Sequence, residues 1–312
     1  MNVLRVFPRR TSYTPHDDCV RIGEPDLCML PRNITEVWVS CVFTWDREYA
    51  TQLAAVWSRF IGVPARIGGP AFDDPGGLFI PGQFVRSGVS ISSRGCPEHC
   101  PWCYIPRREG PLRLLPISVG TDIQDNNVLA FPREHFSRLC AMLRTCKKPA
   151  RFVGGLQASR LTDWHVEKLR GLRIGELWFA CDTPGALRPL KKALARLNGV
   201  FRRRQLRCYV MVGQGGETVE QARHRLEQVW EAGCLPFAQM YHDDAGPVLT
   251  TPPWRKLVRE FSRPAATFRV MEKAGDGPQG EVPRCPGQEM LAWTERPSPG
   301  KCDVPHGESG GE

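Results

Sequence analysis

Six short apolar runs of β-strand character alternate with helical patterns between residues 88 and 241, and this alternation constrains the fold most strongly. Repeated β-α alternation favours a parallel sheet or barrel over helices and strands in separate layers. The 30 Gly and 28 Pro are about a fifth of the 312 residues, against roughly 12% on average, which argues against a helical bundle. The expected strands are 88–93, 115–123, 150–154, 175–181, 205–212 and 235–241, and the expected helices are 132–143, 164–169, 187–197 and 218–230.

A smaller β-α-β pattern precedes this region. EVWVSCVF at 36–43 is a β-rich run, residues 46–60 have apolar side chains at helical spacing, and ARIGGP follows as a second short strand. The expected divisions are an unassigned segment at 1–33, a small β-α-β domain plus linker at 34–86, a β/α barrel region at 87–262, and a Gly/Pro-rich, disordered tail at 263–312.

The composition excludes several protein classes. Hydrophobic residues make up 41% and charged residues 24%, as in folded rather than disordered chains. Thirteen cysteines, an odd number spread along the whole chain, are not typical of a secreted disulfide scaffold. No apolar run reaches the roughly 20 residues that span a bilayer, and the N-terminus does not resemble a signal peptide. We therefore expect a cytoplasmic protein with no membrane partner.

Three cysteines lie close together in SRGCPEHCPWCY, directly after an expected strand. Cys96, Cys100 and Cys103 have the spacing C-x3-C-x2-C, so their thiolates can all reach one metal centre. A [4Fe–4S] cube normally takes four Cys ligands, and three would leave one iron open to a substrate or cofactor. The alternative is a zinc knuckle or a set of buried thiols, although zinc needs a fourth ligand and His99 is awkwardly placed beside Cys100.

This spacing resembles the motif of the radical S-adenosylmethionine (SAM) superfamily, and the resemblance covers about residues 87–245. Trp102 matches the aromatic residue before the third cysteine of the motif. The resemblance implies an α/β fold with a partial (β/α)6 barrel, a [4Fe–4S] cluster on the three cysteines, and SAM on the open iron. It also implies reductive cleavage of SAM to methionine and a 5′-deoxyadenosyl radical, with electrons from a low-potential donor of flavodoxin or ferredoxin type. These motifs do not identify the substrate.

Within the superfamily, the chain most resembles the branch of methylthiotransferases and cobalamin-dependent enzymes. Their second strand ends in an acidic, Asn-rich turn, which IQDNN matches, so Asp125 and Asn126 are expected to hold the amino group of SAM. An Asx turn capping the next helix is the alternative. Gly154 and Gly155 resemble a Gly-Gly-Glu element at which the backbone approaches SAM, with Gln157 displaced by one place and uncharged; a plain turn would also use these glycines.

The fourth and fifth strands carry the other SAM positions that the resemblance implies. Asp182 stands where family members place a polar contact to SAM, and it would equally serve as a helix N-cap. VMVGQGGET is similar to the family segment V-G-x-P-G-E-T, whose backbone packs beside adenine, so Val212 and Gly213 are expected to do so here. Gly215 stands where proline is usual.

The N-terminal segment occupies the place of a cobalamin-binding or methylthiotransferase domain in relatives. It lacks a D-x-H-x-x-G motif around His16, and Cys19, Cys28 and Cys41 do not have the spacing of an auxiliary cluster. We therefore expect a truncated, cofactor-free relative of those domains.

The stretch 186–207 holds eight Arg and Lys and no acid. It is either a nucleic-acid surface or the solvated face of a helix, and the net charge of +9 is compatible with an RNA partner without identifying one. The alternative function for the whole chain is a non-catalytic zinc or iron–sulfur binding protein associated with nucleic acid.

Overall fold

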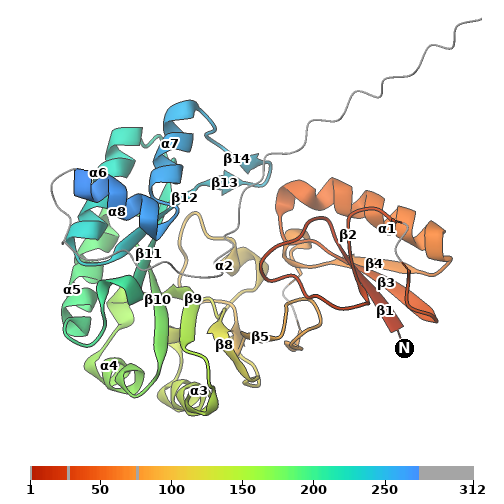
Figure 1. Ribbon diagram of the computed structural model, residues 1–312, viewed down its shortest axis with the longest axis horizontal. Coiled ribbons are helices and arrows are strands. Elements are labelled where there is room, and N and C mark those ends of the chain that lie inside the picture. Colours follow the sequence, from red (N-terminus) through yellow and green to blue (C-terminus); the bar gives the residue numbers. More distant parts are fainter. Residues whose placement is uncertain (1, 27–28, 75–76, 274–312) are drawn as a thin grey trace, which may run out of the picture. The chain divides into compact units, whose positions relative to one another are not determined.

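Two parallel β-sheets organise the part of the chain that the computed structural model describes, which is residues 2–26, 29–74 and 77–273 (Figure 1). The larger sheet has six parallel strands in the order β12-β11-β10-β9-β8-β5. These are β5 (Gly88–Ser90), β8 (Gly120–Ile123), β9 (Ala150–Leu156), β10 (Ile174–Ala180), β11 (Leu206–Val212) and β12 (Leu235–Met240). The α/β class and the parallel sheet expected from the alternation are confirmed.

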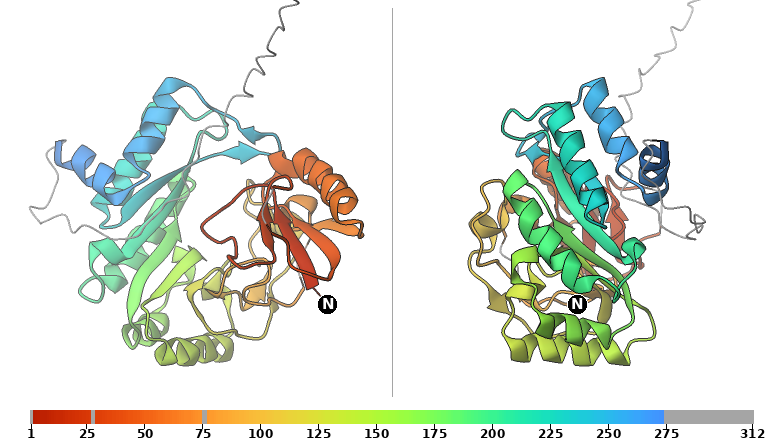
Figure 2. Two further views of the ribbon diagram at one scale, coloured as in Figure 1. Left: turned by 45° about the vertical axis from the view of Figure 1, so that its right-hand side comes forward. Right: turned by 90° about the vertical axis from the view of Figure 1, so that its left-hand side faces the viewer.

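Four helices cover one face of the larger sheet (Figure 2). They are α3 (Arg133–Thr145), α4 (Asp163–Arg170), α5 (Leu187–Leu197) and α6 (Val219–Glu231), close to the four expected helices. Their apolar sides bury Phe136, Leu190 and Leu226 in one core with Phe152 and Leu177 of the strands. Burial of these side chains stabilises the helices far more than their intrinsic propensity does. We call the opposite face of the sheet its inner face.

The expected strand 115–123 is shorter than the sequence pattern suggests. Only Gly120–Ile123 joins the sheet, and the residues before Pro116 turn away. Arg113–Leu114 (β7) instead pairs antiparallel with Ser93–Arg94 (β6), on either side of the cysteine loop and the short helix α2 (Ile105–Arg108). Proline lacks the amide donor that a central strand needs, which explains why the strand begins after it.

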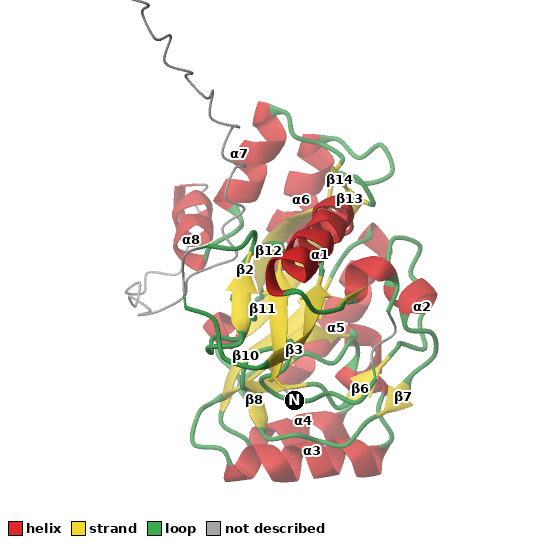
Figure 3. Ribbon diagram, turned by 90° about the vertical axis from the view of Figure 1, so that its right-hand side faces the viewer, coloured by secondary structure: helices red, strands yellow, loops and turns green. Residues whose placement is uncertain are grey.

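The smaller sheet has four parallel strands in the order β2-β1-β3-β4. They are β1 (Asn2–Phe7), β2 (Val20–Ile22), β3 (Ile34–Ser40) and β4 (Ala65–Gly68). Helix α1 (Arg47–Ile61) lies across the strands in Figure 3, with Leu53 and Trp57 buried against Leu4 and Val37. The β-α-β pattern expected at 34–70 therefore supplies β3, α1 and β4, which are only part of this four-stranded sheet.

Two of those strands lie in residues 1–33, where the sequence shows no clear period. In β1, Leu4 and Val6 face the core, whereas Arg5 faces the other side of the sheet. There Arg5 donates hydrogen bonds to the carbonyl oxygens of Gly82 (2.6 Å) and Gln83 (2.7 Å) in the linker. The linker thus covers the second face of this sheet, and its carbonyl oxygens bind Arg5, the residue that interrupts the apolar pattern of β1.

The last described elements are the ribbon β13 (His242–Asp243) with β14 (Gly246–Pro247), and the helices α7 (Pro252–Glu260) and α8 (Pro264–Lys273). Helix α8 corrects the expectation of disorder at 263–273, because Thr267 and Met271 are buried beside α7. The rest of the expected tail, from residue 274, lies outside the described residues. The 3₁₀ turns are η1 (Thr44–Asp46), η2 (Pro70–Phe72), η3 (Val128–Ala130), η4 (Ala158–Arg160), η5 (Pro184–Ala186) and η6 (Arg203–Gln205). No helix among the described residues is both long and apolar enough to cross a bilayer.

Candidate functional site

The cysteine loop, residues 95–104, runs from β6 to α2. Cys100 and Cys103 are exposed and Cys96 is half-buried. Partial burial raises the pKa of the Cys100 thiol, and the negative charge of Cys96 raises it further. Partial burial likewise raises the pKa of Cys103, with further contributions from Cys100 and Cys96. The three thiols therefore lie near enough to repel one another as thiolates, and bound cationic iron would relieve that repulsion.

The spacing of these thiols bears on which metal centre they suit. Within residues 2–26, 29–74 and 77–273, no three His, Cys, Asp or Glu side chains converge closely enough to share one metal ion. Zinc binds four ligands at about 2.0–2.3 Å from one ion. A four-iron cube binds each thiolate through a different iron and accepts a wider separation. The three thiols of the cysteine loop supply three of the donors that either centre uses.

Asp125 fixes the strand that leads into the cysteine loop. Its carboxylate accepts hydrogen bonds from the Ser92 amide (2.8 Å), the Ser92 hydroxyl (3.2 Å) and the Ser93 hydroxyl (2.7 Å). The side chain is 0% exposed, and this burial raises its pKa to about 6. His135 Nε2 lies 3.1 Å from the Ser92 carbonyl oxygen. In this conformation the Asp125 carboxylate therefore binds Ser92 and Ser93, which precede the cysteine loop, and it is not exposed to a ligand.

Glu109 fixes the first residues of the cysteine loop from the other side. Its Oε2 accepts hydrogen bonds from the Gly95 amide (2.8 Å) and from Asn126 Nδ2 (2.7 Å), and Arg94 lies 3.7 Å from Oε1. Gly95 has φ +77°, and a Cβ there would lie 2.1 Å from the carbonyl oxygen of Pro111. Asn126 is thus held at the loop through the Glu109 carboxylate, which sequence reasoning missed.

Gly154 and Gly155 form an irregularity in β9. Between the pairs Leu177↔Phe152 and Phe179↔Leu156, β9 advances four residues while β10 advances two. A Cβ at Gly154 would lie 2.1 Å from the carbonyl oxygen of Asp125, so only glycine allows the two segments to approach this closely. Gly155 has φ +118°. The two glycines are therefore explained by backbone packing beneath the Asn-rich turn.

A chain of polar side chains continues along the loop. Asn127 Nδ2 donates to Gln157 Oε1 (2.7 Å) and lies 3.9 Å from Cys96 Sγ. Arg160 donates to the same Gln157 oxygen (2.6 Å) and to Glu98 Oε1 (2.6 Å) in the cysteine loop. The Arg160 hydrogen bond lowers the pKa of Glu98. Asn127 Oδ1 is buried and has no hydrogen-bond partner among the described residues.

Asp182 follows β10 and lies near the same thiols, because its charge contributes to the raised pKa of Cys100 and Cys103. Burial raises the pKa of Asp182 itself, and a hydrogen bond from the Met211 amide (2.9 Å) opposes that shift. The Asp182 carbonyl oxygen accepts from Gln214 Nε2 (2.6 Å). Gln214 Oε1 is buried without a hydrogen-bond partner in the described part of the chain.

The turn after β11 reaches the loop through Trp102, whose Cζ2 atom would lie 3.9 Å from a Cβ at Gly215. Gly215 has φ +59°, which proline cannot adopt, so this turn requires a residue other than proline here. Val212 is 0% exposed. A Cβ at Gly213 would meet Leu249 Cδ1 at 3.0 Å, so in this conformation that position faces protein rather than open space.

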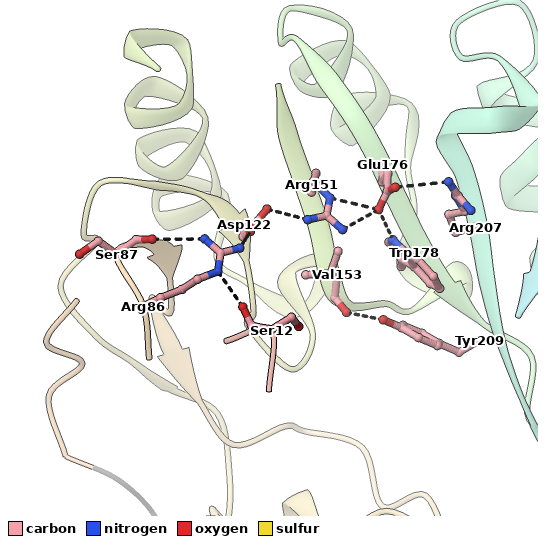
Figure 4. A network of polar contacts seen from close by, with 10 residues as sticks. All are labelled: Ser12, Arg86, Ser87, Asp122, Arg151, Val153, Glu176, Trp178, Arg207 and Tyr209. Carbon is pink, nitrogen blue, oxygen red and sulfur yellow. Dashed lines mark hydrogen bonds and ion pairs between the residues drawn. The ribbon is translucent and has the colours of Figure 1, made fainter. Parts of the chain in front are cut away.

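The inner face of the larger sheet carries a row of ion pairs across four strands (Figure 4). Arg151 bridges Asp122 (3.2 Å) and Glu176 (3.1 Å), and Glu176 also pairs with Arg207 (3.3 Å). Burial raises the pKa of Glu176, but Arg207, Trp178 and Arg151 outweigh it, so the pKa is lowered. Arg151, Glu176 and Arg207 lie in the amino-terminal halves of their strands, and Asp122 pairs in register with Arg151.

An aromatic layer follows on the same face, nearer the carboxyl ends. The Trp178 and Tyr209 rings stack with centroids 4.4 Å apart, and Phe237 meets both edge-on at 5.6 Å and 5.9 Å. Tyr209 also donates a hydrogen bond to the carbonyl oxygen of Val153 (3.0 Å), which the β9 irregularity leaves outside the strand ladder. Ion pairs and aromatic rings together fill this part of the inner face.

Residues following four successive parallel strands thus reach the cysteine loop: Asn126 after β8, Arg160 after β9, Asp182 after β10 and Gly215 after β11. Parallel α/β sheets bind ligands at this edge. The three thiols and these polar groups therefore lie at one edge of the sheet. No protein-family model matches the chain, and no curated protein matches it.

Proposed function

We propose that the chain is a radical SAM enzyme whose six-stranded sheet is a partial (β/α)6 barrel. One observation carries the proposal: an exposed three-cysteine loop lies at the carboxyl edge of the parallel sheet, in reach of residues from four of its strands. A set of thiols retained only for core packing would be buried, as Cys140 and Cys208 are.

Cys96, Cys100 and Cys103 would each bind one iron of a [4Fe–4S] cluster. When bound, such a cluster supplies one electron to SAM, which breaks the C5′–S bond and yields methionine and a 5′-deoxyadenosyl radical. The chain holds the loop that presents the thiols: Asp125 fixes its preceding strand and Glu109 its first amide. These two carboxylates are positioning residues, because neither is presented to a ligand in this conformation.

SAM carries amine donors on its methionine and adenine parts. Two buried amide oxygens beside the cysteine loop lack a donor among the described residues, Asn127 Oδ1 and Gln214 Oε1. A buried acceptor without a partner costs roughly 1–3 kcal/mol, which a bound amine would recover. Asp182 adds a negative charge that acts on Cys100 and Cys103, and its main-chain carbonyl oxygen accepts from Gln214 Nε2. We assign these three side chains, with Asn126, to SAM binding; Val212 and Gly213 would contribute their backbone.

The filled inner face has a role in this function. A primary carbon radical abstracts hydrogen from whatever is near it, so the site has to exclude water and stray donors. The stacked Trp178 and Tyr209 rings and the Arg151–Glu176 pair close the inner face below the loop. The substrate would therefore approach from the carboxyl edge.

The test begins with protein purified without oxygen. We expect about four irons and four sulfides per chain, an electron-paramagnetic signal on reduction, and a change in that signal when SAM is added. Reduction in the presence of SAM should release 5′-deoxyadenosine. One zinc per chain with no visible absorbance would reject the proposal in favour of a zinc protein.

A further inference from the structure

The outer face of α5 is a positively charged strip. Arg188, Lys191 and Lys192 are exposed, with Ala195 completing the same face at helical spacing. The buried face is apolar, formed by Leu190, Ala193, Leu194 and Leu197. No acidic residue occurs between Thr183 and Arg207. The strip therefore has a charge that its own helix does not offset.

These cations are also unpaired across the fold. Arg196, on the flank of α5, pairs with Asp163 at 3.1 Å. No ion pair involves Arg188, Lys191 or Lys192 within residues 2–26, 29–74 and 77–273. Unpaired surface charge of one sign attracts partners of the opposite sign and speeds their association.

The strip begins beside the cysteine loop. Only Thr183 and η5 separate the start of α5 from Asp182, which follows β10 at the carboxyl edge of the sheet. Helix α5 also packs on η4, whose Arg160 holds Glu98 of the loop at 2.6 Å. A protein that binds the strip would therefore lie next to the exposed thiols.

Reductive cleavage of SAM consumes one electron, which the chain's own side chains do not supply. Resting on the proposed function, we propose that the α5 strip is the docking surface for an acidic one-electron donor protein. The donor loses one electron to the cluster in each cycle and leaves oxidised. Weak, charge-steered interfaces are typical of such redox encounters. The strip has no exposed aromatic side chain on which bases would stack, which favours an acidic protein over RNA.

The test compares two matched charge reversals. Lys191→Glu with Lys192→Glu alters the strip, whereas Lys147→Glu with Lys148→Glu alters an equally exposed pair before β9, at the opposite edge of the sheet. The probe is a purified acidic flavodoxin. We expect the strip variant to bind it about tenfold or more weakly at low salt, with the difference vanishing at high salt, and the control to stay within about twofold of wild type.

Reduction kinetics provide the second measurement. Reduced flavodoxin should reduce the cluster of the strip variant about tenfold more slowly, while dithionite, which needs no docking surface, should reduce all proteins equally. A Lys191→Gln, Lys192→Gln variant should fall between, which separates charge from misfolding. Equal binding by the strip variant and wild type would overturn the proposal, as would lost RNA binding with flavodoxin binding intact. Flavodoxin binding is measurable without a cluster, so failure to load iron rejects the enzyme function separately.

Discussion

The two parallel sheets differ most at their carboxyl edges. In the smaller sheet, the polar groups after β1 and β3 satisfy one another: Arg9 pairs through two nitrogens with Asp46, which is 5% exposed. Cys41 is buried, and this burial raises its pKa to about 11. In the larger sheet, two thiols are exposed and two amide oxygens lack partners among the described residues. Both sheets are parallel, but the carboxyl edge is closed by internal polar pairs in the smaller sheet and suited to a ligand in the larger one.

The largest expected contrast is in iron content. Cys96→Ala, Cys100→Ala or Cys103→Ala should each abolish the cluster, because two thiolates do not retain the cube. Cys41→Ala at the smaller sheet, and Cys140→Ala and Cys234→Ala in the core, should leave iron and sulfide unchanged. Chemical analysis of anaerobically prepared protein gives the answer. If the second group of variants lost iron while the first group kept it, the metal would not be bound by the cysteine loop.

A glycine at each sheet provides the next contrast. Gly154→Ala would place a Cβ 2.1 Å from the Asp125 carbonyl oxygen, and moving that backbone should cost at least about 3 kcal/mol of unfolding free energy. Gly62→Ala, at the end of α1, meets no atom within 4 Å and should cost only about 1 kcal/mol, from its left-handed φ of +78°. Urea unfolding measures both. If both variants lost the same unfolding free energy, the backbones of β9 and the Asn-rich turn could move apart at little cost.

Substitution of two buried aspartates by asparagine should change the free energy of unfolding at pH 7 in opposite directions. The folded-state pKa of Asp125, about 6, exceeds the unfolded value of about 3.9. Its protonated form thus stabilises the fold below about pH 4, and this contribution, roughly 3 kcal/mol, is lost as the pH rises through 6. Asp125→Asn should remove that loss, and the variant should be at least as stable as wild type at pH 7.

Asp46→Asn, in contrast, breaks the pair with Arg9 and should lower stability at pH 7. Urea midpoints between pH 4 and 8 separate the two cases. A loss of stability at pH 7 in both variants would show that the hydrogen bonds of the Asp125 carboxylate outweigh its burial.

The smallest effect concerns SAM affinity. Asp182→Ala removes a carboxylate whose charge acts on Cys100 and Cys103, and it should weaken SAM binding about tenfold with iron content unchanged. Asp163→Ala removes an exposed carboxylate whose one ion pair within the described part of the chain is with Arg196, and should not alter SAM binding. Calorimetric titration with SAM compares them. Wild-type affinity in the Asp182 variant would remove this residue from the SAM site.

The elements that the sequence predicts well are those with local signals. The β-α alternation and the spacing of the three cysteines need no knowledge of distant contacts, and most of the expected helices and strands agree with the structure. Strand β1 was missed because Arg5 interrupts its apolar run, and that arginine binds linker carbonyls 77 and 78 residues away. Helix α8 was missed because Pro264 and a Gly/Pro-rich continuation mask a buried Met271.

The candidate site follows the same rule. Asp125 has the residue type and position expected of a SAM contact, but its three hydrogen bonds to Ser92 and Ser93 depend on how β8 meets β5. No sequence motif around Glu109 predicts its contacts, because its hydrogen bond to Asn126 forms only when the loop folds back across that residue. Gln214 was read as the variable position of a turn, and its buried oxygen becomes visible only in the fold.

The Glu109 carboxylate has a kinetic consequence. Its Oε2 atom accepts hydrogen bonds from the Gly95 amide, in the cysteine loop, and from Asn126 Nδ2, in the turn after β8. Opening either segment exposes the other, so the two should exchange their amide hydrogens with solvent as a single cooperative unit. A ligand that binds only to the turn would then slow exchange at Gly95, and the occupancy of one segment could be followed from the protection of the other.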